Sequence, residues 1–129
     1  MATRTVLIAG SGYAGAGIAA KLAALDARRS FNAVILDPSE FHAVKTRLHQ
    51  IAVDPERDIL IRIPTRTLAD FARADFINAS VEEVDFKNRR IFANGSVYDW
   101  DRLVVATGAE PNYFGIPGAA ENSENILSY

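Results

Sequence analysis

A glycine-rich turn lies near the start of the chain, between a short apolar run and a stretch of small residues. The apolar run, Val6 to Ala9, is typical of a buried parallel strand, and Ala14 to Leu25 predicts the helix that follows it. Gly10, Gly12 and Gly15 complete the pattern G-x-G-x-x-G between them. Such glycines allow a tight turn, backbone approach to a pyrophosphate and close packing of helix on strand. The segment therefore predicts a Rossmann-like unit that binds a dinucleotide.

A carboxylate stands where such a unit binds the sugar of its ligand. Asp37 ends the second apolar run, Ala33 to Leu36, about 20 residues after Gly15, and this is the place of the acid that accepts hydrogen bonds from a ribose. No arginine directly follows Asp37 to receive a 2′-phosphate, which favours FAD or NAD over NADP. A second interpretation is that Asp37, standing before Pro38, only starts a turn.

Composition narrows the class of protein. The chain has 129 residues, of which 49% are hydrophobic, a formal net charge of −2 and no cysteine. These values predict one globular, soluble domain without disulfides or thiolate metal sites. The charge indicates no basic surface for nucleic acid. Because no apolar stretch approaches about 18 residues and the first residues lack a signal-peptide pattern, we expect a cytoplasmic protein.

The middle of the chain departs from a simple alternation of strand and helix. Helical spacing predicts helices at Lys45 to Ala52 and at Thr65 to Ala74. In the second of these, Leu68, Phe71 and Ala72 are expected to share the buried face. Both lie in the long connection that follows Asp37.

Several segments are predicted to be strands, and the first two of them alternate. They are Ile59 to Ile63, Phe76 to Phe86, Arg89 to Ala93, Val97 to Trp100 and Arg102 to Ala106. The pair Asn94-Gly95 is favoured in two-residue hairpins and predicts a small antiparallel ribbon. The last strand, RLVVA, is expected to be buried and to lead into Thr107-Gly108. The predicted fold class is α/β, a Rossmann-like parallel sheet with a small antiparallel β-meander inserted, and the sheet is expected to be incomplete.

Three motifs in this order resemble those of a known family. The Gly-rich turn, the meander and the Ala-Thr-Gly that begins at Ala106 are similar to the N-terminal FAD-binding half of pyridine nucleotide-disulfide-oxidoreductase-like flavoproteins. Within that group, ATGAEPNYFGIPG at Ala106 to Gly118 and RLHQIAV at Arg47 to Val53 most resemble type II NADH dehydrogenases. Those enzymes pass electrons from NADH through FAD to a quinone. The resemblance implies a parent enzyme with FAD as cofactor and NADH as co-substrate.

The resemblance also implies which residues contact the cofactor. Those around the FAD pyrophosphate would be Gly10, Ser11, Gly12, Ala14 and Gly15. Asp37 would hold the adenosine ribose, although the family more often has a longer Glu there. Val81 would meet the adenine through its backbone, and Ala106, Thr107 and Gly108 would pass close to the pyrophosphate, where small residues let backbone approach the ligand. An alternative for Thr107-Gly108 is a turn that only ends a strand.

Two basic residues and two histidines follow Asp37. Lys45 and Arg47 fall where related reductases bring a side chain toward the flavin ring, and a cation there would stabilise negative charge on the reduced ring. The alternative, which is commoner for charges on short helices, is that both are solvated. His42 and His49 are interpreted as ordinary surface or partly buried histidines rather than as a proton relay or a metal pair.

The resemblance implies that much of the parent enzyme lies outside these residues. Residues 1–118 are expected to form the N-terminal part of the FAD-binding domain, and residues 119–129 to begin the connection to an NADH-binding domain. Alone, the chain is expected to be inactive, to bind FAD weakly and to self-associate through the bare sheet edge near Val104 to Ala106. The parent is expected to ignore disulfide substrates, since no cysteine pair follows Asp37, and to associate peripherally with the inner face of the membrane.

Two other functions fit part of the pattern. The Gly-rich turn and Asp37 would serve equally in an NAD-binding Rossmann domain of a dehydrogenase. The meander and Thr107-Gly108 argue against that alternative. A non-catalytic nucleotide-binding or interaction module is opposed only by the intact glycines. The predicted partner is a small-molecule dinucleotide, and no nucleic acid is expected to bind.

Overall fold

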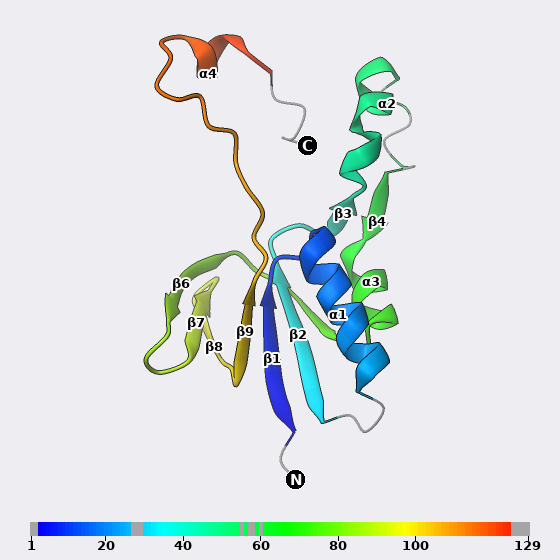
Figure 1. The fold of residues 1–129 in the computed structure, drawn as a ribbon, viewed down its shortest axis with the longest axis vertical. Helices are drawn as coiled ribbons and strands as arrows, with labels where there is room; N and C mark the ends of the chain where they lie inside the picture. The colour runs from blue at the N-terminus through cyan, green and yellow to red at the C-terminus, as the bar shows by residue number, and fades with distance from the viewer. Residues whose placement is uncertain (1–2, 27–29, 55, 57–58, 60, 125–129) are drawn as a thin grey trace. The chain divides into compact units, whose positions relative to one another are not determined.

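The computed structural model describes residues 3–26, 30–54, 56, 59 and 61–124. The chain divides into two compact units, one made of residues 1–42 and 63–107 and the other of residues 43–62 and 108–129. Figure 1 traces the backbone through both units. The Gly-rich turn, Asp37 and the meander lie in the first unit, so the first unit contains most of the residues that the sequence predicts to bind a ligand.

A four-stranded parallel sheet forms the centre of the first unit (Figure 1). Its strands stand in the order β5 (Asp75–Asn78), β2 (Phe31–Asp37), β1 (Arg4–Ala9) and β9 (Arg102–Val105). Apolar runs on the two inner strands, β1 and β2, explain this arrangement, because strands buried on both faces carry continuous apolar sequence. The strand expected at Val6 to Ala9 and the one expected at Ala33 to Leu36 are both confirmed.

The register of the sheet brings three motifs to one end. Ala9 of β1 stands opposite Leu36 of β2 and opposite Val105 of β9. Since parallel strands run the same way, the residues after these three leave the sheet at its carboxyl edge, which is where ligands bind in open α/β sheets. Those residues are the Gly-rich turn, Asp37 and the Ala-Thr-Gly segment.

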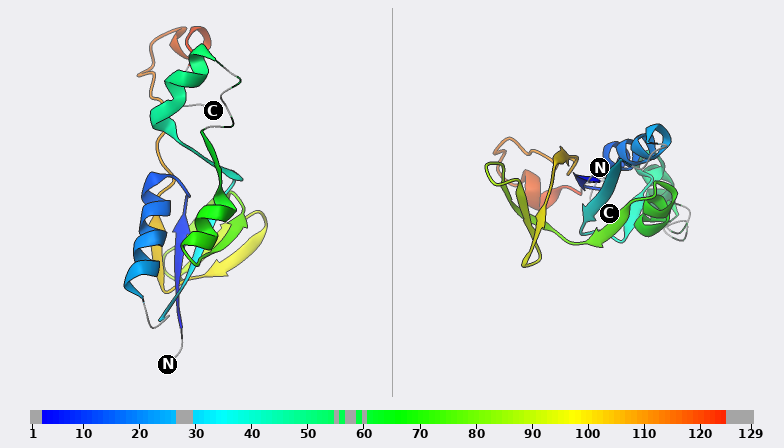
Figure 2. Two further views of the ribbon diagram at one scale, coloured as in Figure 1. Left: turned by 90° about the vertical axis from the view of Figure 1, so that its right-hand side faces the viewer. Right: turned by 90° about the horizontal axis from the view of Figure 1, so that it is seen from below.

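Two helices cover one face of the sheet. α1 (Tyr13–Leu25) follows the Gly-rich turn, and α3 (Thr65–Phe71) precedes β5. Val6 and Ile8 of β1 pack in one buried cluster with Ala19 of α1 and Ala69 of α3. Small alanines at these contacts let the helices lie close to the sheet. Figure 2 shows these helices on one side of the sheet and the antiparallel strands on the other.

A three-stranded antiparallel meander covers the opposite face. It consists of β6 (Val81–Asp85), β7 (Arg90–Ala93) and β8 (Ser96–Asp99) in that order. Leu7 and Ala9, which alternate with the helix-facing residues of β1, pack against Ile91 and Ala93 of β7. The predicted hairpin turn is confirmed, since Asn94 and Gly95 have φ values of 46° and 72°, the two positive values that a type I′ turn requires.

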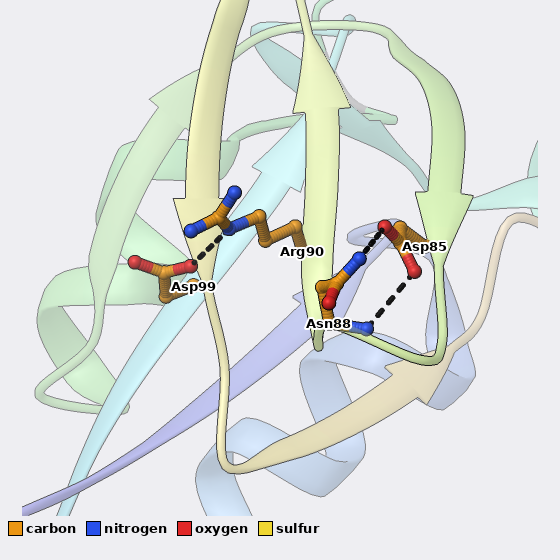
Figure 3. Close-up of polar contacts among 4 residues, drawn as sticks. All are labelled: Asp85, Asn88, Arg90 and Asp99. Carbon is orange, nitrogen blue, oxygen red and sulfur yellow. Dashed lines mark hydrogen bonds and ion pairs between the residues drawn. The ribbon is translucent and has the colours of Figure 1, made fainter.

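Polar contacts close the other turn of the meander (Figure 3). The backbone N–H of Asn88 donates to Asp85 Oδ1 at 2.9 Å and its side-chain Nδ2 donates to Oδ2 at 2.6 Å. These hydrogen bonds hold the pKa of Asp85 below its ordinary value. Arg90 Nε lies 3.2 Å from Asp99 Oδ1 across β7 and β8, but both side chains are exposed and such pairs contribute little stability.

The remaining elements are short. β3 (Phe41–Ala43) and β4 (Arg62–Pro64) form a two-stranded sheet. The second unit contains a 3₁₀ turn, η1 (Lys45–Arg47), followed by α2 (Leu48–Val53), and a single turn, α4 (Ala119–Asn122). Together η1 and α2 confirm the helical segment expected after Asp37. Among the helices of the described residues, none has both the length and the apolar character needed to cross a membrane.

The predicted bounds of two strands in the middle of the chain were wrong. The alternating segment Phe76 to Phe86 is two strands, β5 in the parallel sheet and β6 in the meander, separated at Ala79 and Ser80. Apolar residues are interspersed with polar ones through both strands, because each strand packs some of its side chains against a buried cluster of the first unit. The strand expected at Ile59 to Ile63 begins instead at Arg62, and Leu60 lies outside the described residues.

The burial predicted from the sequence was wrong for Phe71 and for the strand at Arg102 to Ala106. Phe71 is 80% exposed, whereas Thr65, Ala69 and Ala72 are buried. Since a helix turns about 100° per residue, Phe71 and Ala69, two residues apart, lie on nearly opposite faces of α3. The segment RLVVA forms the predicted strand but is only half-buried, and Val105 is 63% exposed, because β9 is an edge strand.

Candidate functional site

Gly10 makes the sharp turn that ends β1. Its φ of 102° is a conformation that residues with a side chain rarely adopt, and its N–H donates to Leu36 O at 2.8 Å. A Cβ on Gly10 would overlap the carbonyl of Ala106 and lie 3.1 Å from the Cα of Thr107. Ala106 and Thr107 therefore run directly against the Gly-rich turn, and the Ala106 N–H, which donates to Ala9 O at 2.7 Å, holds them there.

The fold requires a glycine at position 15 but not at position 12. A Cβ on Gly15, which is buried in α1, would overlap the carbonyl oxygen of Gly10 and lie 3.3 Å from Cγ2 of Ile8. Close packing of helix on strand thus excludes any side chain at Gly15. Gly12 has a φ of −63° and a ψ of −170°, which any residue can adopt, and a Cβ there would meet no described atom within 4 Å. The fold itself therefore does not require glycine at position 12.

The N-terminus of α1 faces the same open space as Gly12. Gly12 is the N-cap residue and has no side chain with which to cap the helix. The first hydrogen bond at this end runs from Ala16 N–H to Gly12 O at 2.9 Å, so the N–H groups of Gly12 and Ala14 have no acceptor within the helix. Such groups, with the positive end of the helix dipole, favour an anion.

Asp37 anchors the Gly-rich turn from the neighbouring strand. Its Oδ2 accepts hydrogen bonds from the N–H of Ser11 at 2.5 Å and from the Ser11 hydroxyl at 2.8 Å. Its Oδ1 accepts from the N–H of Ser39 at 2.7 Å, which is the turn contact that the second interpretation of Asp37 predicted. One carboxylate thus stabilises both the turn after β2 and the turn after β1.

Two residues at this edge were not identified from the sequence as parts of the site. Asn78, at the end of β5, donates from Nδ2 to Asp37 O at 3.1 Å and to Pro38 O at 2.9 Å. His42 is buried, and its Nδ1 lies 2.9 Å from the carbonyl oxygen of Ser11. Asn78 could have been noticed in the sequence, because it is a polar residue directly after apolar ones, as Asp37 is. No pattern in the sequence pairs His42 with Ser11.

The structure brings together most of the predicted ligand-binding residues. The first unit places side by side the turn residues Gly10, Ser11, Gly12, Ala14 and Gly15, the acid Asp37, and Ala106 with Thr107. Val81, at the start of β6, packs against the buried cluster beneath the meander.

The other predicted residues belong to the second unit. Gly108 has the left-handed φ of 83° that favours glycine. Lys45 and Arg47 lie in η1 and are exposed. His49 is exposed in α2. In the described parts of the chain, no group of three or more His, Cys, Asp or Glu residues could hold a metal ion.

Known proteins resemble the chain in sequence and in fold. A type II NADH:quinone oxidoreductase of Staphylococcus aureus (strain NCTC 8325) is 27% identical over 128 residues, which cover 97% of this chain and 32% of that protein. Among solved structures, the sulfide:quinone oxidoreductase of Aquifex aeolicus matches with a TM-score of 0.86 and 23% identity over 96% of this chain and 28% of that chain. NDH2 of Plasmodium falciparum, solved in complex with NADH, matches with a TM-score of 0.78 and 17% identity over 93% of this chain and 25% of that one. The chain thus spans about a third of the length of the curated relatives it matches.

A family model matches almost the whole chain. It describes the pyridine nucleotide-disulphide oxidoreductases and covers residues 4–129. The match includes the meander and the three motifs at the carboxyl edge of the parallel sheet, which are the Gly-rich turn, Asp37 and the Ala-Thr-Gly segment. The chain therefore belongs to the pyridine nucleotide-disulphide oxidoreductase family.

Proposed function

We propose that this chain forms the FAD-binding part of a flavin-dependent NADH oxidoreductase that passes electrons to a quinone. The observation that carries the proposal is the environment of Gly12. Its backbone conformation and its surroundings would accept a side chain, so the fold does not explain a glycine there. A ligand that packs against the backbone in front of α1 explains it, because a pyrophosphate needs that space.

The residues present fit the ADP portion of FAD. Its pyrophosphate would accept hydrogen bonds from the N–H groups of Gly12 and Ala14 at the N-terminus of α1. Ala106 and Thr107 would border the pyrophosphate on the β9 side. The Asp37 carboxylate, whose oxygens already accept hydrogen bonds from Ser11 and Ser39, has lone pairs left to accept hydrogen bonds from the ribose hydroxyls. When bound, FAD supplies a ring that accepts a hydride from NADH and passes the electrons on to an acceptor.

The visible absorption spectrum of the purified full-length protein tests this proposal. FAD gives a yellow protein, which neither bound NAD nor an empty interaction module would produce. We expect flavin bands and the release of FAD on denaturation. A colourless protein that gains no flavin bands on incubation with FAD and dialysis would contradict the proposal, and a colourless protein that binds NAD would favour the dehydrogenase alternative.

Replacing Asp37 is expected to weaken binding of the adenosine ribose. Asp37→Ala should lower affinity for ADP by about 1–3 kcal/mol, because charge-assisted hydrogen bonds to the ribose hydroxyls are lost. Calorimetric titration measures this, and 2′-deoxy-ADP separates the sugar contact from the Ser11 contact. If Asp37 binds the 2′-hydroxyl, the wild-type chain should prefer ADP over 2′-deoxy-ADP and the variant should not.

The matched control for Asp37 is Asp26→Ala. Asp26 also accepts backbone N–H groups, those of Ser30 and Phe31, but it follows the C-terminal end of α1. Its removal should leave ADP affinity unchanged. Equal ADP affinity in Asp37→Ala and the wild type would mean that Asp37 only stabilises the two turns.

The full-length protein is expected to use a quinone and not a disulfide as acceptor. Two features support this: the name of the Staphylococcus aureus relative, and the absence of cysteine from these 129 residues, where disulfide reductases place a thiol pair shortly after the ribose-binding acid. The measurement is NADH oxidation with a water-soluble quinone, with glutathione disulfide or with lipoamide. Rapid reduction of either disulfide would contradict the prediction.

A further inference from the structure

Three hydrogen-bonding groups of Ser11 are all engaged by two neighbouring side chains. Asp37 accepts from the Ser11 N–H and hydroxyl, and His42 Nδ1 lies 2.9 Å from the Ser11 carbonyl oxygen. Ser11 is only 3% exposed and His42 only 8% exposed, so water does not compete freely for these contacts. The residue between the first two glycines of the turn is therefore held from both sides.

The contact with Ser11 determines which ring nitrogen of His42 carries hydrogen. A carbonyl oxygen can only accept, so Nδ1 must be the donor. The Tyr13 ring, from the first turn of α1, meets the His42 ring at a centroid distance of 5.0 Å and an interplanar angle of 86°, an edge-to-face contact that fixes the plane of the imidazole. His42 comes from β3 and thus links that strand to the start of α1.

We propose that His42 is a positioning residue that orients the Gly12 N–H for a phosphate group of the dinucleotide, an inference that rests on the proposed function. The peptide unit that joins Ser11 to Gly12 is planar and trans, so its C=O and its N–H point in opposite directions. By holding the Ser11 carbonyl, His42 turns the Gly12 N–H away from itself. Asp37 fixes the preceding peptide unit through the Ser11 N–H, and the two contacts together set the turn before any ligand arrives.

Two substitutions separate the hydrogen bond from the ring contact. His42→Phe keeps an aromatic ring for Tyr13 and removes the donor. His42→Asn removes the ring and keeps a donor, since Nδ2 of asparagine occupies nearly the place of histidine Nδ1. We expect His42→Phe to weaken ADP binding about tenfold, the effect of losing one oriented charge-assisted hydrogen bond to a phosphate. We expect His42→Asn to bind ADP within about twofold of wild type.

Adenosine provides the readout that a merely structural role would not produce. It lacks phosphate, so its affinity should be the same in the wild type and both variants when measured by NMR titration, while ADP affinity falls only in His42→Phe. Equal ADP affinity in His42→Phe and the wild type, an equal loss for ADP and adenosine, or failure of His42→Asn to restore binding would each overturn the inference.

Measurements on the ligand-free chain distinguish this inference from the proposed function. A wild-type chain with no affinity for ADP would overturn the proposed function and the phosphate role of His42 together. The geometric step is tested without ligand: ¹⁵N NMR at a pH where the imidazole is neutral should find hydrogen on Nδ1. His42→Phe should shift the Gly12 amide resonance and leave that of Gly17 in place. Hydrogen on Nε2, or an unmoved Gly12 resonance, would overturn the inference even if the wild type binds ADP.

Discussion

Gly12→Val should remove FAD from the full-length protein while leaving its fold intact. The added branches would occupy the space in front of α1 that the pyrophosphate needs, and the helix N–H groups could no longer reach it. Within the described structure the Cβ of that side chain would meet no atom within 4 Å, and the backbone φ of −63° is one that residues other than glycine adopt. We expect at least about a 100-fold loss of FAD affinity, which is about 2.8 kcal/mol. The flavin content after purification measures this.

Gly17→Val is the matched control for that prediction. Gly17 lies in the same helix, is exposed, and a Cβ on it would also meet no described atom within 4 Å. Because Gly17 lies five residues after Gly12, more than one helical turn along α1, its side chain should not reach the pyrophosphate, and flavin content should match that of the wild type. A folded Gly12→Val protein with normal flavin content would show that the pyrophosphate does not bind here.

Gly15→Ala should have the opposite profile and destabilise the fold itself. The added methyl group would overlap the carbonyl oxygen of Gly10, and both atoms belong to backbone that the sheet and α1 hold in place. Forcing an extra methyl group into such a contact typically costs about 1–3 kcal/mol and occasionally more. Urea unfolding of this chain should therefore show a lower midpoint of denaturation than the wild type.

Gly17, two residues after Gly15 in α1, also provides the control for Gly15→Ala. Gly17→Ala adds the same methyl group at an exposed helical position with open space, and alanine favours a helix over glycine by about 1 kcal/mol. We expect this variant to unfold at a slightly higher urea concentration than the wild type. A Gly15→Ala chain as stable as Gly17→Ala would mean that α1 and β1 are not packed as closely as the structure has them.

The sequence predicted the carboxyl edge of the sheet well because local patterns determine it. Val6 to Ala9 and Ala33 to Leu36 are continuous apolar runs, and a glycine-rich turn or an acid directly follows each of them. The hairpin at Asn94-Gly95 was equally predictable, since both residues tolerate a positive φ.

Features that depend on tertiary contacts could not be predicted in the same way. Alternation over Phe76 to Phe86 marks one buried side but does not say that the strand changes sheets at Ala79. Helical spacing placed Phe71 on one face with Leu68 and Ala72, whereas Ala69 and Ala72 are the residues of this segment that lie in the cluster buried against the sheet. The contact of His42 with Ser11 joins residues 31 positions apart, and no local pattern reports it.

The most direct test of a pyrophosphate at the Gly-rich turn is a titration of this chain with ADP, followed by the backbone amide resonances in NMR spectra. The amides of Ser11, Gly12 and Ala14 should shift the most, because their N–H groups lie in or beside the turn that would receive the phosphates. Gly95, in the hairpin of the meander, should not move. Saturating ADP that leaves these three resonances in place, or that shifts only residues elsewhere, would contradict the account.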